Sequence, residues 1–551
     1  MSLQFITGNS GNGKTKYLFN RIVKEAKANP RDNYLVIVPE QFTMQTQRQL
    51  VDLSENKAIM NIDVLSFKRL AYRVFDELGI TNLTVLEETG KNLVLRKLAA
   101  QEADKLGVIG RNLNRIGYIS EVKSLLSELV QYNISPEELG RYIASGRLSD
   151  TLSDKLKDVL VLYEAFEKFM QDKYITAEEI LNELSNVAEE SAILRNSVIA
   201  FDEFTGFTPI QNQLIKKLFV ISKKIYVTLT IDCREDIFKS RGMQELFDMP
   251  KRTVKSLTEM AAFYGIEVEE PIILDKNYRL AENEELSFME QQLFRKRRGS
   301  FKKAPKHIHI DCLRDPKQEL TKIARRINEL VRNENLRYRD IAIVTGDVNI
   351  YAGYVREIFD KYNIPYFIDA TQEILFHPFI EFIRSIPDIA AQNFSADAVF
   401  RFLRCGFSEL LDSEIDVLEN YVLACGVRGK SAWDKKWVRL PKHKAGYDLE
   451  LLNQSREYIM ELLKPVYQVF SDKKSTVKDY VLAIYKLIVL LDIPDKLAKK
   501  EQALLDAGDQ TASKEYGQIY KIVMQLFEKY VAVLGLSLIH ISEPTRPEPI
   551  S

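Results

Sequence analysis

Residues 8–15 read Gly-Asn-Ser-Gly-Asn-Gly-Lys-Thr, which matches the pattern G-x-x-x-x-G-K-[ST] of a phosphate-binding loop. The loop follows a short apolar run at residues 3–6, and it precedes residues 14–28, where apolar side chains recur at helical spacing. This motif needs a strand before it and a helix after it. The motif and its flanks therefore predict an α/β fold that binds a polyphosphate at its N-terminal end.

Each residue type in the loop has an expected role. The glycines let the backbone wrap around a polyphosphate with its N–H groups pointing inward, and the following helix N-terminus adds a positive dipole end. Lys14 is expected to reach the β- and γ-phosphates, and Thr15 is expected to hold Mg²⁺ through its hydroxyl. The predicted nucleotide-binding residues are Gly8, Asn9, Ser10, Gly11, Asn12, Gly13, Lys14 and Thr15.

A second candidate feature is the acidic pair Asp202 and Glu203, which ends the apolar run at residues 197–201. A phosphate-loop ATPase places such a pair opposite its lysine, where the aspartate completes the Mg²⁺ shell and the glutamate polarises the attacking water. The alternative is that the pair caps the helix expected near Pro209. Paired with the phosphate loop, the pattern favours Asp202 as a metal ligand and Glu203 as a catalytic residue.

Composition places the chain among ordinary globular proteins, with 551 residues, 46% hydrophobic residues, 28% charged residues and a formal net charge of −1. A near-zero net charge neither requires nor excludes a nucleic-acid partner. The four cysteines are widely separated, and no apolar stretch is long enough to span a bilayer. With a first strand expected at residue 3, which leaves no room for a secretory leader, these features predict a cytoplasmic protein without a membrane segment.

The alternation of strand-like and helix-like segments predicts an α/β fold with two RecA-like parallel-sheet domains, each with a large all-helical insertion. In the second block, strands are expected at residues 307–313, 341–344 and 365–369. The predicted segments are residues 1–87 (start of the first domain, with the phosphate loop), 88–190 (helical insertion), 191–294 (remainder of the first domain), 295–306 (basic linker), 307–385 (second domain, incomplete), 386–536 (helical insertion) and 537–551 (a probable non-native tail).

Two segments are candidates for contact with nucleic acid. Residues 295–306 are dense in lysine and arginine, and they form either a solvated linker or a contact with DNA phosphates. Trp433 and Trp437 stand among basic residues that include Lys442 and Lys444, so their rings either stack on single-stranded bases or pack into a core.

Taken together, the chain resembles superfamily 1 helicases of the UvrD type, and within them the AddB (RexB) family, the B subunits of the bacterial ATP-dependent helicase/deoxyribonuclease. The resemblance covers essentially residues 1–536. It is carried by residues 5–16, 38–43, 64–74, 202–209, 364–369 and 377–384.

The resemblance implies a subunit that binds ATP, Mg²⁺ and DNA, both duplex ends and single strands, and that pairs with an AddA-type helicase-nuclease subunit. Such a heterodimer resects double-strand breaks for recombinational repair, and its B subunit is linked to recognition of the Chi signal. Arg279 in Asn-Tyr-Arg is similar to an arginine that touches the γ-phosphate. Relatives are about twice this length, and their other half resumes the second RecA-like domain and carries a nuclease domain with a 4Fe-4S cluster, which is expected only there.

One departure concerns turnover. Where a motor helicase of this kind has Gly-Asp-x-x-Gln, residues 230–234 read Thr-Ile-Asp-Cys-Arg and lack the glutamine that senses the γ-phosphate. The chain is therefore expected to bind ATP·Mg²⁺, to hydrolyse it very slowly and to have no nuclease activity. Two alternatives stay open, a non-catalytic DNA scaffold with ATP as a structural or regulatory ligand, and a small-molecule kinase.

Overall fold

The computed structural model describes residues 1–534 except 56, 81–84, 111–116, 146–147, 171–173, 296–298, 371–372, 442–446 and 473. The predicted tail at 537–551 lies outside the described residues. The chain divides into two compact units, Met1–His309 and Ile310–Ser551. No helix in the described residues is both long and apolar enough to cross a bilayer.

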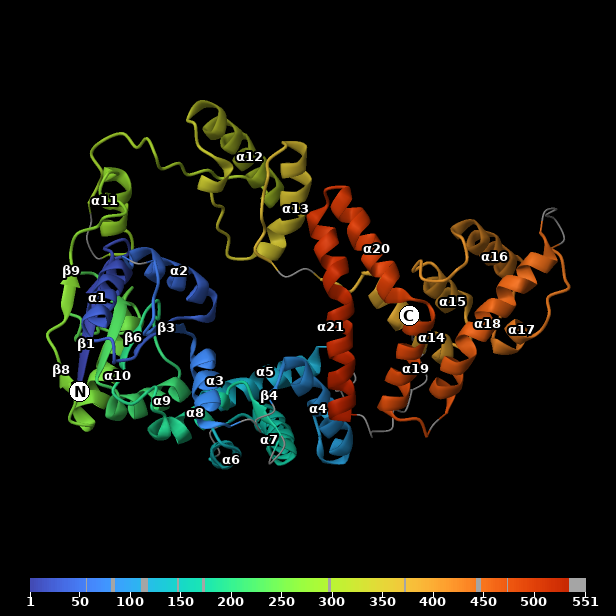
Figure 1. The fold of residues 1–551 in the computed structure, drawn as a ribbon, viewed down its shortest axis with the longest axis horizontal. Helices are drawn as coiled ribbons and strands as arrows, with labels where there is room; N and C mark the ends of the chain where they lie inside the picture. Colours follow the sequence, from blue (N-terminus) through green and yellow to red (C-terminus); the bar gives the residue numbers. More distant parts are fainter. Residues whose placement is uncertain are drawn as a thin grey trace. The chain divides into compact units, whose positions relative to one another are not determined.

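The first unit is built on a parallel sheet with strand order β3-β2-β6-β7-β1-β8, and β9 also pairs with β1 (Figure 1). The phosphate-loop strand β1 and the acidic strand β6 lie on opposite sides of β7, and all three run in the same direction. The α/β class is thus confirmed. The strands are β1 (Ser2–Gly8), β2 (Tyr34–Ile37), β3 (Ile62–Leu65), β6 (Val198–Phe201), β7 (Lys224–Thr230), β8 (Glu267–Val268) and β9 (Ile272–Leu274).

Helices cover both faces of this sheet, because its strands are apolar on both sides. In β1, Leu3 and Phe5 face one hydrophobic cluster and Ile6 faces the other, as the two-residue period of a strand requires. The first cluster includes side chains of α3 (Phe67–Leu78), α8 (Ile180–Val187), α9 (Pro209–Ile221) and α10 (Asp248–Phe263), and the second those of α1 (Lys14–Ala28) and α2 (Thr43–Leu53).

The helical insertion predicted within this α/β unit is present. A two-stranded parallel pair, β4 (Val85–Leu86) and β5 (Ile175–Thr176), brings the two ends of the insertion together. A capping box formed by Ser135 and Glu138 opens α6, with Pro136 at its first position. The helices of the insertion are α4 (Glu88–Gln101), α5 (Tyr118–Gln131), α6 (Pro136–Ala144) and α7 (Asp150–Met170).

The second unit differs from the prediction. The described residues at 307–313, 341–344 and 365–369 form no strand, so the three strands expected there are wrong for this structure. A strand needs a neighbouring ladder for its N–H and C=O groups, and none of the described residues pairs with these segments. Ile310 is 93% exposed and Val344 is 94% exposed, so these two side chains are not buried as a core strand would require, although Ile341 packs against the core of α12 and α13.

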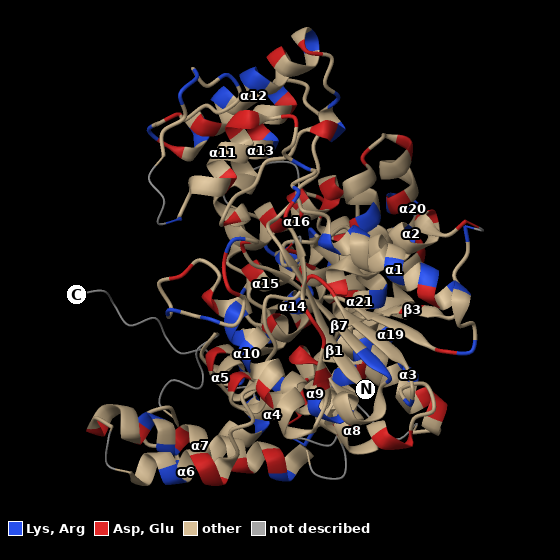
Figure 2. Cartoon of the chain, turned by 90° about the vertical axis from the view of Figure 1, so that its left-hand side faces the viewer, with Lys and Arg blue, Asp and Glu red and all other residues tan. Residues whose placement is uncertain are grey.

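The remainder of the second unit is helical. A small core joins α12 (Pro316–Asn333) to α13 (Val348–Lys361), and a large aromatic core joins the helices that follow. Along α12, lysine and arginine residues are interspersed with glutamates (Figure 2). The later helices are α14 (Pro378–Ala391), α15 (Ala396–Leu403), α16 (Asp412–Cys425), α17 (Lys430–Asp434), α18 (Leu449–Ser471), α19 (Val477–Leu490), α20 (Ile493–Asp506) and α21 (Gln510–Leu534).

Candidate nucleotide-binding site

The phosphate loop joins β1 to α1 at the carboxyl edge of the sheet. Gly11 has φ 88° and Gly13 has φ 79°, a left-handed conformation that favours glycine. Helix α1 begins at Lys14, directly after Gly13. The free N–H groups of the first helical turn therefore face the loop, as an anion-binding site requires.

Lys14 lies folded over its own loop. Its Nζ donates to the carbonyl oxygens of Gly8 at 3.1 Å and Asn9 at 3.0 Å. Burial lowers the pKa of Lys14, and the nearby carboxylates of Glu203 and Asp202 act in the opposite direction. Two neutral carbonyls are weaker partners for an ammonium than a phosphate oxygen. The lysine is thus held where it can exchange these contacts for an anionic ligand.

The acidic pair lies across β7 from the loop, as predicted. Asp202 is 1% exposed, and its Oδ1 accepts a hydrogen bond from the Thr228 hydroxyl of β7. Its Oδ2 is buried without a hydrogen-bond partner among the described residues. Burial raises the pKa of Asp202, and the bond from Thr228 opposes that shift. A buried carboxylate oxygen without a partner is costly, which indicates that a ligand completes its environment.

Glu203 has φ 63°, which is unusual for a residue other than glycine and turns the chain sharply after β6. Its Oε1 accepts a hydrogen bond from the Thr15 hydroxyl at 3.3 Å. Thr15, Asp202 and Glu203 thus offer hard oxygen ligands beside the loop. Mg²⁺ typically takes one or two such protein ligands together with phosphate oxygens and water, so these residues fit an ion carried by a nucleotide.

The segment 277–279 closes over the loop from the side of β9. The backbone N–H groups of Tyr278 and Arg279 donate to the carbonyl of Gly11 at 3.0 and 3.4 Å, and Asn277 Nδ2 donates to the carbonyl of Ser10 at 2.9 Å. Arg279 also donates from Nη1 to the Ser10 hydroxyl at 3.4 Å. The structure therefore brings the predicted Arg279 to the loop.

These residues surround a cavity of about 760 Å³, which falls within the usual range for small-molecule sites. Tyr278 and the residues of α2 are among the lining residues that were not predicted from the sequence. Tyr278 belongs to the same three-residue element as Arg279, so that element was the signal for it. The residues of α2 carry no signal that points to a ligand. The lining includes Ser10, Gly11, Gly13, Lys14, Thr15, Lys16, Gln49, Asp52, Leu53, Asp202, Glu203, Tyr278 and Arg279.

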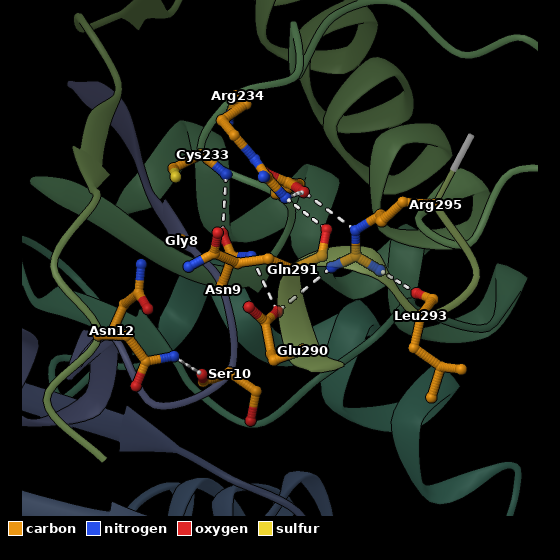
Figure 3. A network of polar contacts seen from close by, with 12 residues as sticks. Gly8, Asn9, Ser10, Asn12, Cys233, Arg234, Glu290, Gln291, Leu293 and Arg295 are labelled. Atoms are coloured by element: carbon orange, nitrogen blue, oxygen red, sulfur yellow. Dashed lines mark hydrogen bonds and ion pairs between the residues drawn. The ribbon is translucent and has the colours of Figure 1, made fainter. Parts of the chain in front are cut away.

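The side chains of two predicted ligand-binding residues contact the protein instead, and Figure 3 shows the contacts of Asn9. Asn12 Nδ2 donates to the carbonyl of Leu274 at 2.6 Å. Asn9 Oδ1 accepts from the backbone N–H of Cys233 at 2.9 Å, and its Nδ2 donates to Glu290 Oε1 at 2.9 Å. At these two positions the side-chain amide donates within the protein, so a phosphate could be bound only by the backbone N–H groups.

The tryptophan segment needs correction, whereas a contact between residues 295–306 and DNA phosphates stays a prediction except at Arg295, since Lys302, Lys303 and Lys306 are exposed. Trp433 is 0% exposed and Trp437 is also buried, so base stacking by these rings is wrong; both belong to the aromatic core, where burial of a large ring is most favourable. Arg295 is held in ion pairs with Asp232 and Glu290 and is not available to DNA. Residues 296–298 and the lysines at 442 and 444 lie outside the described residues.

Comparison with known proteins finds one family model and several similar sequences. A family model described as "ADDB, N-terminal" matches residues 5–290. The chain is similar to the B subunit of the ATP-dependent helicase/deoxyribonuclease of Lachnoclostridium phytofermentans, with 38% identity over 98% of this chain and 48% of that protein. The proteins of the same name from Clostridium acetobutylicum and Caldanaerobacter subterraneus are 31% and 32% identical, each over 99% of this chain and 48% of the relative. The chain thus spans about half the length of these curated relatives.

Proposed function

The chain belongs to the AddB family, and from that premise we propose that it is the nucleotide-binding, helicase-like N-terminal region of the B subunit of an ATP-dependent helicase/deoxyribonuclease. One observation carries the proposal. The phosphate loop, the acidic pair and Arg279 come from distant regions of the sequence, yet they line the same cavity. A small-molecule kinase would leave the match over the whole chain without an explanation.

In this proposal the ligand is ATP with Mg²⁺, and the ion neutralises charge on the phosphates. Thr15 and Asp202 hold the ion, and Lys14 leaves the carbonyls of its loop for the β- and γ-phosphates. Glu203 accepts a proton from water beside the γ-phosphate, and Arg279 meets the charge that develops there. The partnerless oxygen of Asp202 supports the metal assignment.

We further propose that this region of the protein turns ATP over slowly. The position of the missing γ-phosphate-sensing glutamine follows β7, where Asp232 is buried in hydrogen bonds with Arg234 and Arg295. These contacts hold the segment inside the protein. An arginine supplied to the transition state contributes a factor of about 10³ to 10⁵ in such reactions. Arg279 is the one arginine among the described lining residues of the cavity, and we propose that it alone does not compensate for the missing glutamine.

The relatives' names state a helicase, a deoxyribonuclease and more than one subunit. We propose that the longer protein acts in the cytoplasm with an AddA-type partner, that it resects DNA ends and helps to recognise Chi, and that its nuclease and 4Fe-4S centre lie outside this region. The cysteines of this chain are all free, at positions 233, 312, 405 and 425. The alternative is a non-catalytic DNA scaffold in which ATP is a structural or regulatory ligand.

A groove of about 420 Å³ offers a surface for single-stranded DNA beside the nucleotide cavity, and Thr205 lines both. Its lining includes hydroxyl groups, an amide at Asn212, the exposed ring of Tyr132 and the guanidinium of Arg252, which pairs with Asp248 at 2.8 Å but is 57% exposed. Donors of this kind bind phosphates and sugars, and exposed rings stack on bases. Replacement of Arg252 by alanine should weaken single-strand binding and reduce the salt slope by about 0.7 if it contacts one phosphate.

The proposal is tested by titration calorimetry of the 551-residue chain with ATP and Mg²⁺. Lys14→Ala should weaken binding about 10- to 100-fold, since a hydrogen bond to a charged group contributes about 1.5–3 kcal/mol. Lys24→Ala, which changes an exposed lysine of the same helix, is the matched control. Unchanged affinity in Lys14→Ala would remove the phosphate-loop assignment. Phosphate release with and without DNA then separates a motor, at several turnovers per second, from the scaffold.

A further inference from the structure

The side chain of Asn9 uses both its polar atoms inside the protein. Its carbonyl oxygen accepts from the N–H of Cys233, and its amide donates to Glu290 Oε1, each at 2.9 Å. The backbone carbonyl of the same residue accepts one of the two hydrogen bonds that hold Lys14. The position of Asn9 therefore sets where the loop and its lysine rest.

Glu290 belongs to a buried charge cluster at the end of α11 (Glu284–Gln292). Arg295 donates from Nη2 to Glu290 Oε1 at 3.3 Å and from Nε to Asp232 Oδ2 at 3.0 Å, and its guanidinium lies 4.6 Å from the centre of the Phe247 ring. Its side chain is 8% exposed. Arg234 contacts Asp232 from the other side, with Nε 2.7 Å from Oδ1.

The charged groups of this cluster keep their ionisation state and their positions. Burial acts to raise the pKa of Asp232, but the hydrogen bonds from Arg234 and Arg295 outweigh it and lower that pKa. A planar guanidinium with buried partners on two sides has little freedom to rotate. Arg295 thus holds the Glu290 carboxylate in one place, and that carboxylate is a stronger acceptor for the Asn9 amide than a neutral oxygen would be.

We propose that Arg295 is a positioning residue of the nucleotide site, which acts through Glu290 and Asn9 to hold the phosphate loop in its binding conformation. The inference rests on the proposed binding of ATP and deepens it. It gives the first residue of the basic segment 295–306 a role in nucleotide binding instead of DNA binding. Because coupling between sites is reciprocal, a bound nucleotide stabilises the Arg295 cluster in return.

The experiment is a double-mutant cycle on the 551-residue chain, with the affinity for ATP·Mg²⁺ as the readout. Arg295→Ala and Asn9→Ala are each expected to weaken binding about 5- to 30-fold, as for residues coupled in one network. The double variant should be no weaker than the weaker single variant, because both changes break the same connection. A purely structural role for Arg295 would lower the unfolding temperature and leave the nucleotide affinity unchanged.

Lys303→Ala is the matched control, because Lys303 lies in the same basic segment and forms an exposed ion pair with Glu284. It should bind ATP like the wild type. If Arg295→Ala does not fold, Asn9→Ala and Glu290→Gln take over the cycle, since both leave the Arg295–Asp232 pair in place. Each of these two variants should also weaken ATP binding, and the loss of affinity in their double variant should be no larger than the larger single loss.

The outcomes separate this inference from the proposed function. A wild-type chain that binds no nucleotide would overturn both. The positioning role alone would be overturned if the wild type binds ATP and the folded Arg295→Ala and Asn9→Ala variants bind it with the same affinity as the wild type. The positioning role would also be overturned if the fold-losses in ATP affinity of the two single variants multiply in the double variant, because the two residues would then act independently.

Discussion

Replacing Asp202 by asparagine should stabilise the free protein and strongly reduce its response to Mg²⁺ and ATP. The carboxylate is almost fully buried, with one oxygen bound by the Thr228 hydroxyl and the other without a partner among the described residues. A buried polar group without a partner costs about 1–3 kcal/mol. An asparagine keeps an oxygen for Thr228 and removes the buried charge.

The expected gain in the free energy of unfolding is about 1–2 kcal/mol. It is smaller than the full cost of the partnerless carboxylate oxygen, because the new amide also lacks a full set of hydrogen-bond partners. For the unit Met1–His309, each kcal/mol corresponds to a rise in Tm of about 1–2 °C. The response to ligand should change in the opposite direction. A wild type at 100 times its Kd gains about 2.7 kcal/mol from the nucleotide, and the variant should gain much less.

Differential scanning calorimetry would measure both effects, first in EDTA and then with Mg²⁺ and ATP. Asp76→Asn, at an exposed carboxylate of α3, controls for the change of net charge. The reasoning is refuted if Asp202→Asn lowers Tm in EDTA while it keeps the wild-type shift with Mg²⁺ and ATP. That result would mean that the carboxylate is a structural partner and not a metal ligand.

Three further changes are expected to separate binding from stability. Gly11→Ala would place a Cβ 2.7 Å from Asn277 Oδ1 at φ 88°, so calorimetric titration should show weaker ATP binding in a folded protein. Asp158→Ala removes the acceptor of three backbone N–H groups, so chemical denaturation should show a loss of about 4.5 kcal/mol or more, at about 1.5–3 kcal/mol for each such bond. Burial lowers the pKa of His377, so the stability it contributes is present above its ordinary pKa and is lost as pH falls through the folded value. Thermal melts from about pH 7.5 to about 5.5 should show this loss in the wild type and less of it in His377→Asn, which keeps a cap for α14.

The sequence predicted the first unit well because its signals are local and physically redundant. The apolar run at residues 3–6 lies within β1, and the expected helix at residues 14–28 matches α1. Glycines with left-handed backbone, a lysine at the helix start and an apolar strand before them all require the same geometry. The predicted positions of Lys14, Thr15, Asp202 and Glu203 follow from that geometry.

The sequence failed where an element depends on a partner elsewhere in the chain. An apolar run such as residues 341–344 has strand character, but pairing decides whether it becomes a strand. The two tryptophans look accessible in a basic stretch, yet burial of large rings outweighs the local charge. The amides of Asn9 and Asn12 stand at variable positions of the motif, and nothing in the pattern distinguishes a ligand contact from a contact with Glu290 or Leu274.

The site tolerates a long helical insertion because sheet register, and not chain length, places its acidic pair. Thr15 and Glu203 are 188 residues apart, yet their side chains are hydrogen-bonded. Phe201 of β6 and Phe5 of β1 both pair with Val227 of β7, so the two strands end at the same edge whatever is inserted between them. Lengthening a connection costs only about 0.6 kcal/mol per doubling, whereas a slip by one residue would turn the aspartate to the other face. Changes to the insertion should therefore alter what the protein contacts without altering how it binds a nucleotide.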